Sequence, residues 1–103
     1  MTITIASIQS RVAAHYGLTD ADMRSQCRER RVARPRQVAM YLAVRVAGKS
    51  RAMTGRRFGG RHHTTVMSAL VQIDRRLDAA IFALGVEIGG GMTGWPAGGA
   101  VEA

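Results

Sequence analysis

The chain has 103 residues and a formal net charge of +8, which suits one small domain with a modest core. Twelve of its fifteen basic residues lie between Arg24 and Arg61, where Glu29 is the only acid; this pattern indicates a nucleic-acid binder, the alternative being an ordinary basic surface. No apolar stretch is long enough to span a membrane, no secretion signal is seen, and the lone Cys27 fits a reducing cytoplasm.

The first two helices are expected over residues 5–16 and 20–26. In the first, apolar residues recur at helical spacing, and they are Ile5, Ile8, Val12 and Tyr16. Thr4 is placed to cap its N-terminus, and Gly17 suits the position just past its C-terminus. Thr19 is placed in the same way before the second helix, whose first turn carries two aspartates near the positive end of the helix dipole.

The third and fourth helices are expected over residues 35–48 and 51–58. An arginine-rich polar stretch precedes the third helix, which we expect to begin at Pro35 because proline suits the first helical position. Gly48 is expected to end this helix, and Ser50 to cap the fourth. Gly59 and Gly60 then break the chain sharply before the next element.

A fifth helix is expected from Arg61 to Leu84. Its apolar positions have a heptad-like spacing, at 66, 70, 73, 77, 80 and 84. The first half of this stripe fits the core of the domain, whereas residues 77–84 are a candidate surface for a homodimer. The glycine-rich residues 85–103 are expected to form a flexible tail.

The short fourth helix, the glycine turn and the longer fifth helix together predict a helix-turn-helix within a compact all-α domain. The second helix of this motif enters the major groove of DNA with its first turn against base edges. Here that turn is Arg61-His62-His63-Thr64-Thr65, where every side chain can donate, accept or offer a methyl group. The predicted organisation is therefore a DNA-binding domain over residues 1–84 and a tail over 85–103.

Two segments carry the motifs of one family. Residues 58–66, Phe-Gly-Gly-Arg-His-His-Thr-Thr-Val, resemble its FGGR-D-HTTV signature, and residues 32–42 resemble its ARPRQ-IAMYL segment. At this spacing, about the first three quarters of the chain resembles the DNA-binding domain (domain IV) of the bacterial replication initiator DnaA. The resemblance implies a Trp-repressor-like helical fold and recognition of DnaA boxes in double-stranded DNA, at origins and some promoters.

The resemblance also implies roles for individual residues. The start of the fifth helix would read the major groove, and Arg28, in the loop before the proline, would enter the minor groove; the alternative for Arg28 is a solvated arginine. Arg34 and Arg36 frame the expected helix start, which can face a phosphate. The full set expected to contact DNA is Arg28, Arg34, Arg36, Lys49, Ser50, Arg51, Arg61, His62, His63, Thr64 and Thr65.

Three positions depart from the family pattern. His62 stands where the family has aspartate, residues 51–54 replace a Leu-Pro-Glu-Ile run, and Val44 replaces a basic residue. We expect these departures to alter the preferred DNA sequence rather than the fold.

Other chemistries are not favoured. Gly48-Lys49-Ser50 looks like the end of a P-loop, but Ala43 stands where that motif needs glycine and a helix is expected before it, so we expect no ATPase. Adjacent histidines on a helix point about 100° apart, so His62 and His63 are not expected to bind a metal. No spacing suggests an enzyme, a cofactor site or a small-molecule substrate.

The expected function is sequence-specific binding of double-stranded DNA in the cytoplasm, at the nucleoid, in the regulation of replication or transcription. The alternative is a protein-interaction adaptor that binds the full initiator or its partners in place of DNA.

Overall fold

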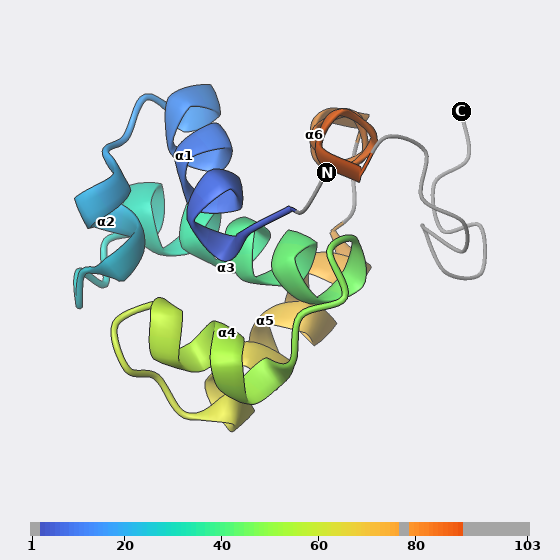
Figure 1. Ribbon diagram of the computed structural model, residues 1–103. Helices are drawn as coiled ribbons and strands as arrows, with labels where there is room; N and C mark the ends of the chain where they lie inside the picture. The colour runs from blue at the N-terminus through green and yellow to red at the C-terminus, as the bar shows by residue number, and fades with distance from the viewer. Residues whose placement is uncertain (1–2, 77–78, 90–103) are drawn as a thin grey trace.

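The structure is a computed structural model that describes residues 3–76 and 79–89. Over these residues the chain forms helices and no strand, as the sequence predicted (Figure 1). The helices are α1 (Ile5–Tyr16), α2 (Asp20–Arg24), α3 (Arg30–Arg45), α4 (Arg51–Arg57), α5 (His63–Arg75) and α6 (Ala79–Gly89). None of the helices in this part of the chain is long and apolar enough to cross a membrane.

The predicted bounds of α1 are confirmed, and side chains explain them. The Thr4 hydroxyl accepts a hydrogen bond from the Ser7 amide, and the Ser7 side chain bonds back to Thr4, so two free amides of the first turn are satisfied. Gly17 ends the helix in the left-handed conformation, at φ 71°. Thr19 and Asp22 form the same kind of capping box at α2, which ends at Arg24, two residues earlier than expected, where the backbone of Ser25 becomes extended.

The start of α3 differs from the prediction. The helix begins at Arg30, with Pro35 inside it, and not at Pro35. Proline cannot donate to the carbonyl of Arg31, which costs one helical hydrogen bond. Val32, which is 1% exposed, fixes the first turn in the core, and Val32 and Ala33 both donate to the Glu29 carbonyl. Burial of apolar side chains over this extra turn offsets the lost bond.

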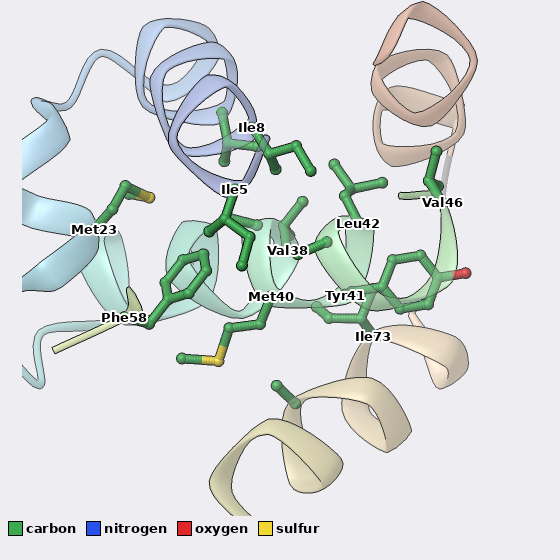
Figure 2. Close-up of a cluster of buried hydrophobic side chains, with 14 of the residues drawn as sticks. Ile5, Ile8, Met23, Val38, Met40, Tyr41, Leu42, Val46, Phe58 and Ile73 are labelled. Atoms are coloured by element: carbon green, nitrogen blue, oxygen red, sulfur yellow. The ribbon is translucent and has the colours of Figure 1, made fainter. Parts of the chain in front are cut away.

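The core is built around α3. This helix packs against α1, α2, α4 and α5, and its residues 38–43 are all buried. Figure 2 shows Val38 and Leu42 on the side of α1, where Ile8 points toward them, and Met40 and Tyr41 on the side that carries Ile73 of α5. α3 therefore holds the helix-turn-helix against the rest of the domain.

The predicted helix-turn-helix is formed by α4 and α5, which pack against each other. Ser50 caps α4 by accepting a hydrogen bond from the Met53 amide. Gly59 and Gly60 make the turn with φ of 86° and 73°, a backbone region that side chains other than glycine rarely adopt. The Phe58 side chain is fully buried and anchors the turn in the core.

The prediction that one helix runs from Arg61 to Leu84 is wrong. α5 ends at Arg75, and α6 leaves in another direction (Figure 1). Ile81 and Leu84 of α6, which are 5% and 4% exposed, lie in the same core as the buried residues of α1 and α3. Arg11 of α1 forms an ion pair with Glu87 of α6. A straight continuation of α5 would carry these apolar side chains away from the core, so their burial favours the break.

The break also changes two expectations for the end of the chain. Residues 85–89 are helical, so a flexible tail does not begin at residue 85; residues 90–103 lie outside the described part. Leu84, which was expected on the homodimer surface, faces its own core, and Leu77 lies outside the described residues. The continuous heptad-like stripe on which that surface depended is therefore absent.

Candidate nucleic-acid interface

The start of α5 has the two properties that base reading needs. His62, His63, Thr64 and Thr65 are all exposed. The residues that follow on the inner face of the helix are buried, and they are Val66, Ala69, Leu70 and Ile73. Polar side chains thus project from a helix end whose body is fixed in the core, as expected of a helix that enters the major groove.

His62 caps this helix. Its Nδ1 accepts a hydrogen bond from the Thr64 amide at 3.3 Å and lies 2.9 Å from the Thr64 hydroxyl. Because Nδ1 accepts, the ring proton is assigned to Nε2, which remains available as a donor. Aspartate, which the family has at this position, is a preferred N-cap residue. Position 62 therefore caps the helix as well as being a candidate to read bases.

The capping geometry predicts opposite effects of His62→Asp on folding and on DNA binding. Aspartate is a better cap and favours the positive end of the helix dipole, so the free energy of unfolding should rise by about 0.5–1 kcal/mol. The new negative charge should at the same time lower the affinity for random-sequence duplex. Urea denaturation and fluorescence anisotropy measure the two effects.

His62→Asn is the matched control, since asparagine caps without a charge. It should stabilise the fold and bind random duplex more tightly than His62→Asp does. Equal random-duplex affinity for the two variants would show that position 62 lies away from DNA.

A basic cleft runs between α3 and α5. One part, of about 320 Å³, is lined by residues that include Arg36, Arg61, Thr64 and Thr65. The adjoining part, of about 190 Å³, is lined by Arg28, Arg30, Arg34, Gln72 and Arg76 among others. Ala33 and Gln37 line both parts, so we treat them as one α3–α5 cleft, with the start of α5 at one end and Arg28 at the other.

The charge of the α3–α5 cleft is of one sign. Among the described residues, six arginines line it and no acidic residue does. A groove with one sign of charge and partly buried walls concentrates counter-ions, and phosphate groups in particular match arginine in shape and charge. The cleft is therefore suited to hold a phosphate backbone.

The sequence prediction missed several residues of this cleft, because it placed the start of α3 too late. With the helix starting at Arg30, residues 30, 33, 34 and 37 fall at the spacing of one helical face, and all four line the cleft. Gln72 and Arg76 add the facing side from α5. Arg34 was already expected to contact DNA, and the correct helix start would have revealed Arg30, Ala33 and Gln37 from the spacing alone.

Arg36 and Arg61 were expected to contact DNA, but their side chains bind main-chain carbonyls of the protein itself. Arg36 is 5% exposed and donates to the carbonyl oxygens of Ser25 and Cys27 at 3.1 and 2.7 Å. Arg61 donates to the carbonyl oxygens of Phe58 and Ser25 at 2.7 and 3.1 Å. Burial lowers the pKa of both guanidinium groups, and the charge of Arg61 lowers that of Arg36 further. The hydrogen bonds of both groups are thus directed into the protein.

The position of Arg34 also differs from the prediction that it lies at the start of the third helix. It lies within α3, in its second turn, so Arg34 and Arg36 do not frame a helix start. Arg28 is exposed, in the loop between α2 and α3.

The three predicted contacts at the N-terminus of α4, Lys49, Ser50 and Arg51, lie apart from the α3–α5 cleft. Lys49 lines a different cleft of about 370 Å³ with residues of α1 and α4, including Ile5 and Arg57. The Ser50 hydroxyl is used as the cap of α4, and Arg51 is exposed. In the described residues no three histidine, cysteine or acidic side chains gather as metal ligands would.

Comparison with known proteins places the chain in a family. The family described as bacterial dnaA protein helix-turn-helix matches residues 5–73. The chromosomal replication initiator protein DnaA of Zymomonas mobilis subsp. mobilis is 52% identical over 73 residues, which is 71% of this chain and 15% of that protein. The DnaA of Sphingopyxis alaskensis is 51% identical over 88 residues, 80% of this chain and 19% of that protein.

A solved structure agrees with these relatives. A crystal structure described as a DNA replication initiation factor superposes with a TM-score of 0.71 at 27% identity, over 84% of this chain and 27% of that one. The chain spans less than a fifth of the two DnaA proteins named above. The match over residues 5–73 and the identity of about one half show that the chain belongs to the family of bacterial DnaA helix-turn-helix domains.

Proposed function

We propose that this chain binds duplex DNA at a preferred sequence, with the start of α5 in the major groove and Arg28 in the adjacent minor groove. The observation that carries this proposal is the α3–α5 cleft, which joins the two reading elements and which, within residues 3–76 and 79–89, is lined by six arginines and no acid. The phosphate backbone that separates the two grooves would lie along the cleft. Phosphate contacts would set the register and the two ends would read bases.

The side chains at the start of α5 suit particular bases. With Nδ1 engaged by Thr64, His62 has its Nε2 proton left to donate, and guanine offers acceptors at N7 and O6. An aspartate at this position could only accept, as from the amino group of cytosine. We therefore propose a site related to the DnaA box but with a different preference at the base that position 62 faces.

The biological role proposed is the regulation of replication initiation or of transcription in the cytoplasm, at the nucleoid. The relatives are named chromosomal replication initiators, and their domain matched here is a helix-turn-helix. The P-loop-like residues 48–50 connect α3 to the cap of α4, whereas a P-loop follows a strand. We propose that the matched domain acts by binding DNA and without nucleotide hydrolysis.

Thr64→Ala and Thr65→Ala test the proposal. Each should weaken binding to a duplex selected from a random pool by about 1–3 kcal/mol per lost base contact. Binding to a base-shuffled duplex should hardly change, because the phosphate contacts remain. Equal losses on both duplexes would show that these threonines do not read bases.

A further inference from the structure

We propose that Arg36 and Arg61 are positioning residues that hold Arg28 at a fixed place relative to α5. The inference rests on the proposed function, because it gives these arginines a role in how the two reading elements act together. We name the pair the arginine bracket, and residues 25–29 the α2–α3 loop.

The two guanidinium groups meet on one acceptor. Arg61 donates to the Ser25 carbonyl at 3.1 Å, and Arg36 donates to the same oxygen at 3.1 Å. With its other nitrogen Arg61 reaches the Phe58 carbonyl at 2.7 Å. Arg61 therefore ties the α2–α3 loop to the turn of the helix-turn-helix, and Arg36 ties the same loop to the middle of α3.

A second contact holds the Gly59-Gly60 turn of the helix-turn-helix against the α2–α3 loop. Gln26 donates from its side chain to the Gly59 carbonyl at 3.1 Å. A Cβ atom on Gly59 would lie 2.5 Å from the Arg24 carbonyl oxygen, so only glycine allows this close approach. The loop and the turn are thus joined at several points although they are more than thirty residues apart in the sequence.

The arginine bracket acts directly beside Arg28. Its N-terminal neighbour, Cys27, has its carbonyl held by Arg36 at 2.7 Å. Its C-terminal neighbour, Glu29, is the N-cap of α3, and the Glu29 carbonyl accepts from two amides of that helix. The backbone of Arg28 is therefore fixed on both sides while its side chain stays exposed.

Charge supports a role beyond simple packing. The hydrogen bonds that the arginine bracket makes to described residues go to carbonyl and hydroxyl oxygens, and none of these goes to a carboxylate. Two like charges that share one acceptor repel each other, and both groups also line the α3–α5 cleft. A DNA phosphate in the cleft would carry negative charge close to both guanidinium groups and so reduce their repulsion. We therefore expect DNA binding to stabilise the arginine bracket.

Arg61→Lys tests the inference, because lysine keeps the charge but lacks the planar fork that reaches two carbonyls. In the parent protein, Arg28→Ala should weaken binding to the selected duplex about tenfold, the loss of one base contact. In the Arg61→Lys background the same change should cost less than about twofold, whereas Thr65→Ala should cost the same in both. Arg56→Lys, on an exposed arginine of α4, is the matched control and should leave the full effect of Arg28→Ala.

Hydrogen exchange on the DNA-free protein gives a second measurement. Arg61→Lys and Arg36→Lys should each speed the exchange of amides in the α2–α3 loop, with the amides of α1 unchanged. Unchanged exchange in the loop, or an undiminished effect of Arg28→Ala in the Arg61→Lys background, would overturn the inference. If the loop loosens but neither Arg28→Ala nor Thr65→Ala affects binding in the parent protein, the proposed function fails, and the link of the arginine bracket to DNA fails with it.

Discussion

Gly55→Ala is expected to lower the free energy of unfolding by about 3 kcal/mol or more. Alanine normally stabilises a helix by about 1 kcal/mol relative to glycine, so the expected sign is opposite to that of helix propensity. Gly55 lies in α4, and a Cβ atom there would overlap the backbone carbonyl oxygen of Arg61. The Arg61 amide also donates to the Gly55 carbonyl at 2.8 Å, so the chain before α5 has no room to move away.

Urea denaturation measures this effect, and Gly48→Ala is the control. Unlike Gly55, Gly48 has a positive φ, of 69°, and a Cβ atom there would meet no atom within 4 Å. Its replacement should cost only the backbone strain of about 1–2 kcal/mol. A Gly55→Ala protein as stable as the parent would mean that α4 and the turn do not approach each other so closely.

DNA affinity should fall about a thousandfold when the salt concentration rises from 50 to 200 mM. About six phosphate contacts would give a slope near −5 in the logarithm of affinity against the logarithm of salt concentration. The physical cause is the release of counter-ions from DNA when the arginines neutralise its phosphates. A titration by fluorescence anisotropy at several salt concentrations measures the slope.

Single arginines should contribute to this slope according to their position. Arg30→Ala and Arg76→Ala, which remove side chains from the cleft, should each reduce its magnitude by about one. Arg11→Ala removes the same charge from α1, where Arg11 pairs with Glu87, and should leave the slope unchanged. A slope near zero, or an equal reduction by all three variants, would contradict phosphate binding in the cleft.

Much of the fold could be predicted because it depends on local rules. Thr4, Thr19 and Ser50 cap helices where the sequence placed them, and Gly59 and Gly60 make the turn. The errors arose where tertiary packing overrides such rules. Burial of Val32 starts α3 before its proline, and burial of Leu84 turns α6 back against the core.

Only part of the candidate site could be predicted from the sequence. The polar start of α5 could be predicted, because polar residues follow directly after Gly59-Gly60 and the apolar stripe begins only at Val66. The inward direction of Arg36 and Arg61 could not, because their acceptors are main-chain carbonyls in other segments. Every residue has a backbone carbonyl, so an arginine that donates to one has no partner that can be recognised in the sequence. From the sequence alone it cannot be told from an arginine that binds a phosphate.

Methylation interference on the selected duplex tests the central claim most directly, because it reports the two grooves separately. Methylation of guanine N7 marks the major groove, and methylation of adenine N3 marks the minor groove. The account predicts one cluster of N7 interference and one of N3 interference about half a helical turn apart, roughly five base pairs. Arg28→Ala should abolish the N3 cluster and leave the N7 cluster in place. Interference in neither groove, or an N3 cluster that survives Arg28→Ala, would contradict the account.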